Sequence, residues 1–256
     1  MVLNILNETS SLESLIVGIA DSNGGVPDIK DVYDPKSRIH ILSGTYPKEE
    51  DMINELDYFV SVLESYGIKV YRPRIIKNYN QIYSRDIGFV IENKFIKSNI
   101  LPIRSREIDA LNDILNLFNS DSIITFPNDA HIEGGDIVLH QNKIYVGAYI
   151  KKSYSEYITA RTNLRGLKVL QTYFPNKEVV LLELNKSNIN PKKNILHLDC
   201  CFQPIGKSFA IIHKEGFSST KQLLALIDDF GIENCFFINS SEMFDMMSNV
   251  FSINNH

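Results

Sequence analysis

The stretch GDIVLHQNKIYVG (residues 135–147) decides the fold class. Its two apolar runs are rich in β-branched and aromatic residues and flank a polar Gln-Asn pair, which is typical of a β-hairpin. The same design recurs at residues 85–96 and 199–212, where each copy begins at or beside an acid and turns on Asn or Gly. A further copy opens over residues 248–255. This recurrence predicts a structural repeat.

The segment after each complete hairpin also repeats, with apolar residues at helical spacing and then a short apolar strand. We expect helices at 106–118, 154–170 and 220–230, and strands at 123–126, 178–182 and 235–238. A strand at 15–18, a helix at 51–66 and a strand at 69–73 have the same order at the front of the chain. The repeated unit is therefore ββαβ, used about five times, with the last copy incomplete.

Units of this kind cannot bury their faces alone, so the copies must pack around a common axis. The alternative is an open α/β sheet of βαβ units, but tight hairpins do not suit a purely parallel sheet. We expect a single α/β domain over residues 1–256 with a radial arrangement of its units.

The composition is that of a globular protein, with 44% hydrophobic and 22% charged residues among 256. Lys and Arg number 26 against 31 Asp and Glu, so the net charge is −5 and no nucleic-acid partner is expected. No apolar run approaches the roughly 18 residues of a membrane span, and the start does not resemble a secretory signal. We therefore expect a cytoplasmic protein without a membrane partner.

Acidic residues at the hairpin starts are the first candidates for a functional site. In a radial arrangement the equivalent strand ends converge, which would bring together Asp86, Glu133, Asp136, His197 and Asp199. A cleft lined by several carboxylates and one His favours a cation. A planar guanidinium fits best, because carboxylates can accept paired hydrogen bonds from it.

Two local motifs sharpen this interpretation. Gly134 and Gly135 stand between two acids just before a strand, which predicts unusual backbone angles, although an ordinary turn remains the alternative. His197 and Asp199 are two residues apart, so on a strand both would face the same side. An Arg-Asp pair such as Arg85 and its neighbour is usually a surface ion pair when taken alone.

A metal site is the weaker hypothesis. The acids and histidines near the motifs include ligand types, but no H-E-x-x-H or C-x-x-C framework is present. Three cysteines without such spacing also argue against a disulfide scaffold. We expect neither a metal nor another cofactor.

Three motifs carry a family resemblance: Arg85-Asp86, Glu133-Gly134-Gly135-Asp136 and His197-x-Asp199. In this order within ββαβ units they resemble the guanidino-group-modifying superfamily of amidinotransferases, arginine deiminases and dimethylarginine dimethylaminohydrolases. The resemblance spans about residues 12–253. It implies a five-bladed α/β propeller, or pentein, and an enzyme that acts on arginine or a related guanidino compound.

The resemblance also implies roles by position. Asp86 and Asp199 would grip the guanidinium, His197 would be the general acid/base, and Glu133 would orient or charge-couple that histidine. Arg161 would meet a substrate carboxylate, with a solvated helix residue as its alternative.

Four further residues would support the site structurally. Asp136 would brace the glycine turn formed by Gly134 and Gly135, and Arg85 would lie beside the gripping acids.

The family reacts through a cysteine near the C-terminus, in the last unit of the propeller. Cys200, Cys201 and Cys235 are better explained as packing residues, so the sequence offers no nucleophile. We expect a chain truncated in its last unit, with exposed edge strands, that binds guanidino substrates without turning them over.

Alternatives stay open at this point. Transferase and hydrolase chemistry differ only in whether an amine or water reaches the intermediate. A non-catalytic propeller that binds a partner and a metal-dependent hydrolase are the competing functions. The expected partner is a small cationic guanidino compound, and a homo-oligomer stays open.

Overall fold

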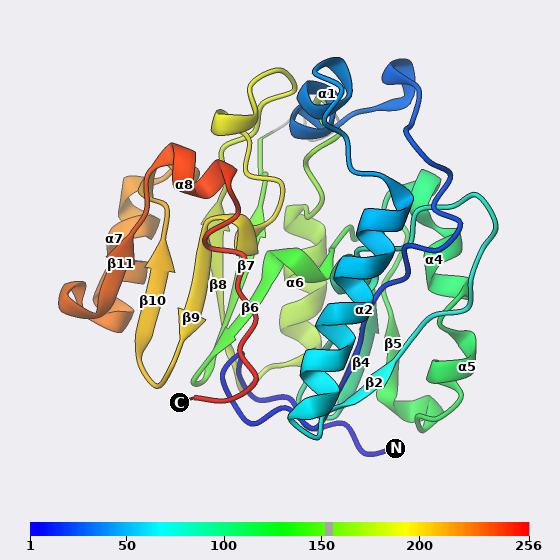
Figure 1. The fold of residues 1–256 in the computed structure, drawn as a ribbon. Coiled ribbons are helices and arrows are strands. Elements are labelled where there is room, and N and C mark those ends of the chain that lie inside the picture. Colours follow the sequence, from blue (N-terminus) through cyan, green and yellow to red (C-terminus); the bar gives the residue numbers. More distant parts are fainter. Residues whose placement is uncertain (152–155, 256) are drawn as a thin grey trace.

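The computed structural model describes residues 1–151 and 156–255, and the repeat is visible within them as four sheets (Figure 1). Three sheets share one order: two antiparallel strands, then a third strand parallel to the second. Their strands are β3 (Gly88–Ile91), β4 (Lys94–Lys97) and β5 (Ile123–Thr125); β6 (Ile137–His140), β7 (Lys143–Ala148) and β8 (Glu178–Glu183); and β9 (Phe202–Ile205), β10 (Phe209–Ile212) and β11 (Cys235–Phe237). The predicted ββαβ unit is confirmed.

The hairpins turn where the sequence predicts. The first turn residue of each has a positive φ: Glu92 at 54°, Gln141 at 52° and Gly206 at 56°. This left-handed backbone matches the twist of the flanking strands, so it permits a tight connection.

The first sheet has two strands instead of three and lacks the antiparallel strand of the others. It pairs β1 (Ser14–Ile16) in parallel with β2 (Lys69–Tyr71), and the chain between them forms α1 (Pro35–Leu42) and α2 (Glu49–Ser65). These elements repeat the second half of a unit.

The C-terminal segment returns to this first sheet. Leu12 N–H donates to the Ile253 carbonyl at 2.9 Å, and the Ile253 side chain packs against a core that contains Val17 and Leu63. After α8 (Ser240–Phe244), the described residues up to 255 form no strand, so the hairpin opening expected there is wrong. The segment thus lies beside the chain that leads into β1.

The helices agree with the prediction in part. α7 (Thr220–Phe230) has the expected bounds, whereas 106–118 forms two short helices, α4 (Arg106–Asp109) and α5 (Asn112–Leu115). The break arises from a tertiary contact, because the Ala110 carbonyl accepts from Arg74 N–H at 2.9 Å and not from the next helical turn.

The third unit's helix is shorter than predicted. α6 (Leu164–Tyr173) begins where the Asn163 side chain accepts from Gly166 N–H at 2.8 Å, an N-cap that ends the preceding irregular chain. Residues 154 and 155 of the predicted helix lie outside the described residues. No helix in the described ranges is long and apolar enough to cross a membrane.

Successive sheets share cores through alternating side chains. In β6, Ile137 and Leu139 pack with the side chains of β3–β5, whereas Val138 between them packs with those of β9 and β10. In β7, Tyr145 also packs with the side chains of β9 and β10. Its ring meets the Phe202 ring edge-on, with 5.3 Å between the ring centres. The period of two along a strand therefore buries the third sheet on both faces.

Candidate active site

The candidate acids and His197 lie in, or directly before, three equivalent turns, each just before the first strand of its sheet. These turns are α3 (Ser84–Ile87), η4 (Gly134–Asp136) and η7 (Leu198–Cys200). Each is closed by a backbone bond from the fourth residue to the first: Asp86 to Tyr83 at 3.2 Å, Asp136 to Glu133 at 3.1 Å, and Cys200 to His197 at 3.1 Å.

The strands thus start later than the sequence pattern indicated. Residues 85–87 and 199–200 are helical, so the expectation that His197 and Asp199 share one face of a strand is wrong. These short helical turns satisfy backbone N–H groups locally, before the strand hydrogen bonds of the hairpins begin.

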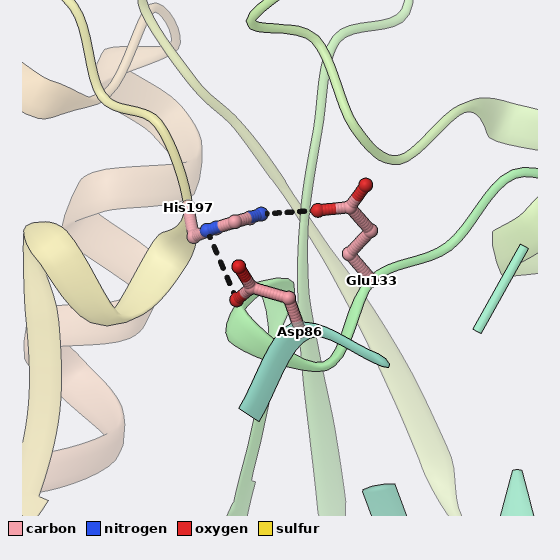
Figure 2. A group of neighbouring side chains, drawn as sticks. All are labelled: Asp86, Glu133 and His197. Carbon is pink, nitrogen blue, oxygen red and sulfur yellow. Dashed lines mark hydrogen bonds and ion pairs between the residues drawn. The ribbon is translucent and has the colours of Figure 1, made fainter. Parts of the chain in front are cut away.

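Three side chains from the three turns meet in one buried cluster (Figure 2). His197 Nε2 lies 2.9 Å from Glu133 Oε2, and His197 Nδ1 lies 3.5 Å from Asp86 Oδ1. All three residues are less than 9% exposed. Residues separated by 111 positions in the sequence, 86 to 197, therefore form one constellation, as the repeat predicted.

The cluster holds its histidine in the charged form. Burial alone would lower the pKa of His197, but the Asp86 carboxylate and the Glu133 hydrogen bond raise it to about 9. Burial opposes the ionised form of Glu133 as well, but the bond from His197 and the charge of Arg161 hold its pKa well below the usual range. At neutral pH His197 is an imidazolium with a proton on each nitrogen; Nε2 donates to Glu133, and Nδ1 forms a longer ion pair with Asp86.

Two arginines neutralise the carboxylates of this cluster. Arg161 Nη1 donates to both Glu133 oxygens at 3.0 and 3.1 Å, with both side chains about 1% exposed. Arg104 donates to Asp86 Oδ2 at 2.7 Å and, through Nε, to Glu107 Oε1 at 2.7 Å. Buried charges persist in proteins when they are paired in this way.

Arg104 and Glu107 were not predicted from the sequence. Their only sequence signal is the Arg-x-x-Glu spacing, which is common on exposed helices. Here Glu107 is 2% exposed, and burial raises its pKa against the opposing charge of Arg104. The pair belongs to the site because Arg104 links it to Asp86.

Arg161 is neither solvated nor directed to bulk water. Its guanidinium carbon lies 5.0 Å from the centre of the Tyr33 ring, and its Nε donates to the Ile158 carbonyl at 3.2 Å. The solvated alternative for Arg161 is wrong, because the residue is 2% exposed. Its guanidinium contacts a carboxylate of the protein.

Glycine is required at positions 134 and 135 because other parts of the chain approach closely, and not because of the backbone angles. Gly134 and Gly135 are absent from the residues with positive φ, so the unusual angles expected there are wrong. A Cβ on Gly134 would lie 2.1 Å from the Arg85 carbonyl oxygen, and one on Gly135 would lie 2.7 Å from the His197 ring. Only glycine lets these turns touch.

Asp136 connects two of the turns. Its Oδ1 accepts from Leu198 N–H at 3.0 Å, while burial raises the pKa of its carboxyl. Gly147 leaves room for this carboxylate, since a Cβ there would stand 2.8 Å from Oδ1. Asp136 thus joins the glycine turn to the turn that carries Asp199.

Asp199 and Arg85 lie next to the cluster. Arg85 Nε is 3.8 Å from Asp199 Oδ2, and Arg85 Nη2 donates to the Ile137 carbonyl at 2.7 Å. Burial raises the pKa of Asp199 to about 6, although the charges of His197 and Arg85 work in the opposite direction. The Asp199 carboxylate has no short ion pair with a cation among the described residues.

The cluster also has the donor types of a metal site. One atom each from Asp86, Glu133 and His197 lie within 4.8 Å of one another. The carboxylates of Asp86 and Glu133 already accept from Arg104 and Arg161, and His197 carries a proton on both nitrogens at neutral pH. A divalent cation there would have to displace three positive charges, so the donor set does not fit a metal.

A cavity of about 380 Å³ lies beside the cluster and not over it. Tyr33, Ile103 and Ile158 are among its lining residues. Tyr33 and the Ile158 carbonyl also contact Arg161, so this guanidinium links the lining of the cavity to Glu133.

None of the three cysteines carries a reactive thiolate. Burial and the Asp199 carboxylate raise the pKa of Cys200 and Cys201 well above the ordinary value. Cys235 lies in β11, where its thiol donates to the Gly231 carbonyl at 3.3 Å. A reactive cysteine needs a lowered pKa and access to its substrate.

Comparison with known proteins now adds the family. A family model described as "N,N dimethylarginine dimethylhydrolase, eukaryotic" matches residues 45–256. The chain belongs to this family. The dimethylarginine dimethylhydrolase family is of the guanidino-modifying type that the three motifs indicated.

One curated relative is the uncharacterized protein YkgA of Bacillus subtilis (strain 168). It is 32% identical over 176 residues, which cover 68% of this chain and 53% of YkgA. The chain thus spans about half the length of the curated relative it matches.

Solved structures of this type share the fold. The N-terminal domain of ArgZ, an arginine dihydrolase from Cyanobacteria, was solved as a cysteine-to-serine variant bound to substrate; it has a TM-score of 0.74 at 16% identity and covers 94% of this chain and 81% of that one. The amidinotransferase SxtG from Microseira wollei has a TM-score of 0.71 at 18% identity, and the match covers 99% of this chain and 84% of SxtG. The inosamine-phosphate amidinotransferase StrB1 from Streptomyces griseus has a TM-score of 0.71 at 13% identity over 100% and 84%. The chain has the mixed α/β fold of pentein amidinotransferases.

Proposed function

We propose that this chain binds the guanidinium group of arginine or a related guanidino compound between Asp86 and Asp199, beside His197. One observation carries the proposal: carboxylates and an imidazolium from three repeats meet in one buried cluster. A dimethylarginine dimethylhydrolase relative is expected to recognise such a group.

The two gripping acids have unused acceptor capacity. Asp86 Oδ1 has His197 as its neighbour at 3.5 Å, which is longer than a hydrogen bond. Asp199 has a thiol at 3.5 Å and a guanidinium nitrogen at 3.8 Å. A planar guanidinium would supply short, charge-assisted bonds to both carboxylates.

The remaining residues support C–N bond cleavage. His197, held as an imidazolium, would give a proton to the departing nitrogen, and Glu133 fixes its orientation. Arg161 would act through Glu133 as a positioning residue. Nη1 and Nε of Arg161 already donate to Glu133 and to the Ile158 carbonyl. A direct contact of Arg161 with a substrate carboxylate would therefore use Nη2.

Turnover needs a group that attacks the guanidinium carbon. ArgZ shows this type of reaction, because one structure of its N-terminal domain carries a covalently bonded reaction intermediate. The cysteines of the present chain lack a thiolate, so we propose a guanidino-binding protein that does not turn its ligand over. Whether a complete reaction would be transfer or hydrolysis depends on access to the site.

Arginine affinity should rise with pH through about pH 6. The carboxyl of Asp199 has a raised pKa of about 6, and only its ionised form attracts a cation. Its charged neighbours His197 and Arg85 favour ionisation, whereas Asp86 and Asp136 oppose it. With one controlling carboxylate, the affinity at pH 5 should be about 10-fold below that at pH 8. Calorimetric titration at pH 5, 6, 7 and 8 measures this.

Asp199→Asn provides the comparison. This variant should bind arginine at least about 10-fold more weakly at pH 8 and lose the step near pH 6. Asp113→Asn, at an exposed position of α5, should behave as the parent chain does. An unchanged pH profile in Asp199→Asn would show that this residue does not contact the ligand.

A further inference from the structure

A fourth turn of the same design precedes the C-terminal segment. Asn249 N–H donates to the Met246 carbonyl at 2.9 Å, which is the four-residue closure found in the three site turns. Met246 has a φ of 64°, a left-handed conformation that is uncommon for a long side chain. Such outliers persist where the surroundings hold them.

Ser248 is the third residue of this fourth turn, the position that Asp199 has in its own turn. It is 0% exposed, and its Oγ donates to the Cys200 carbonyl at 2.6 Å. Cys200 ends the turn that follows His197 and contains Asp199. The Ser248 hydroxyl is thus anchored at the convergence of the repeats.

Among the described residues, this hydroxyl forms its hydrogen bond with a group that is not a base. It donates to a carbonyl oxygen, which accepts a hydrogen bond but does not remove a proton. His197 is an imidazolium at neutral pH, and its two nitrogens face Asp86 and Glu133. An unactivated serine is a weak nucleophile, whereas a cysteine ionises far more readily.

We propose that Ser248 occupies the attacking position of the site, so that this chain holds its guanidino ligand without consuming it, and that a thiol at this position would attack the ligand. The inference rests on the proposed function. It adds the residue that decides between binding and catalysis.

A thiol at position 248 would react in two steps: formation of a covalent intermediate and then its hydrolysis. The thiol first loses its proton to solvent, and the thiolate sulfur then forms a bond to the guanidinium carbon while the C=N electron pair moves onto nitrogen. His197 gives its proton to the departing nitrogen and the C–N bond breaks, which releases ammonia from arginine or dimethylamine from dimethylarginine. Water then adds to the carbon and returns one proton to His197; the S–C bond breaks, the remaining hydroxyl proton passes to solvent, and citrulline leaves with the thiolate restored.

The test is the variant Ser248→Cys. Incubated with arginine and with dimethylarginine, it should form citrulline at least about 100-fold faster than the parent chain, which should show only background. Intact-mass spectrometry should detect an adduct on the peptide that contains residue 248. Ser252→Cys places a thiol four residues further along the same segment, and it should give neither product nor adduct.

The outcomes separate the two proposals. If the parent chain does not bind arginine, the proposed function fails. If Ser248→Cys is folded and binds arginine but forms neither adduct nor citrulline, the assignment of Ser248 fails and the binding function stands. Citrulline production by the parent chain would also overturn the assignment.

A second measurement does not depend on the variant. In a crystal structure of the parent chain with arginine, the guanidinium carbon should lie within about 3 to 4 Å of Ser248 Oγ, the range from which attack occurs. A guanidinium that binds elsewhere, or that turns another atom toward Ser248, overturns the inference.

Discussion

Replacing Arg161 with methionine should lower the free energy of unfolding by about 3 to 5 kcal/mol. Methionine keeps much of the volume but leaves the Glu133 carboxylate buried without its two hydrogen bonds from Nη1. Chemical denaturation followed by circular dichroism measures the change.

Two further variants define what that loss means. Arg165→Met removes an exposed ion pair with Asp129 at 3.3 Å and should cost less than about 0.5 kcal/mol. Adding Glu133→Gln to Arg161→Met should recover part of the loss, because the unpaired charge is then gone. Equal losses for Arg161→Met and Arg165→Met would contradict the buried pair.

Gly134→Ala should be the most damaging single-methyl change at the site. The new Cβ would stand 2.1 Å from the Arg85 carbonyl oxygen, a backbone atom that cannot move aside alone. We expect a loss of at least about 3 kcal/mol in stability, or failure to fold.

Gly67→Ala is the matched change at a glycine of the other kind. Gly67 has a φ of 76° and open space around its Cβ position, so alanine should cost only about 1 kcal/mol there. Thermal unfolding of the two variants side by side measures the difference. A Gly134→Ala variant as stable as Gly67→Ala would mean that the two turns do not touch as described.

Local patterns predicted much of the fold because the hairpins and α7 are encoded by neighbouring residues. Alternation and turn residues give the three hairpins, and a 3.6-residue period gives Thr220–Phe230. The split between α4 and α5 was not predictable in this way. It depends on Arg74, which is distant in sequence and takes the Ala110 carbonyl.

The C-terminal segment shows the same limit. The spacing of the repeat indicated the start of a new, incomplete unit at residues 248–255. In the structure the segment lies beside Leu12, and Ile253 enters the core of the first sheet. A pairing between the two ends of a chain leaves no local signal.

The sequence predicted the site residues that belong to motifs. It did not predict those that join the site only through contacts in the folded chain. Asp86, Glu133 and His197 stand in recognisable motifs, so their convergence was predictable from the repeat. Arg104 entered only through its contact with Asp86, and Ser248 only through its burial and its bond to Cys200. These two features are tertiary.

The main proposal is that Asp86 and Asp199 recognise a guanidinium cation. Calorimetric titration of the parent chain with L-arginine and with L-citrulline at pH 8 tests this most directly, because the two ligands have nearly the same shape and only arginine is charged at that end. Arginine should bind at least about 100-fold more tightly, since citrulline leaves the carboxylates of Asp86 and Asp199 without a cation. Equal affinities, or no binding of arginine by the folded chain, would contradict the claim.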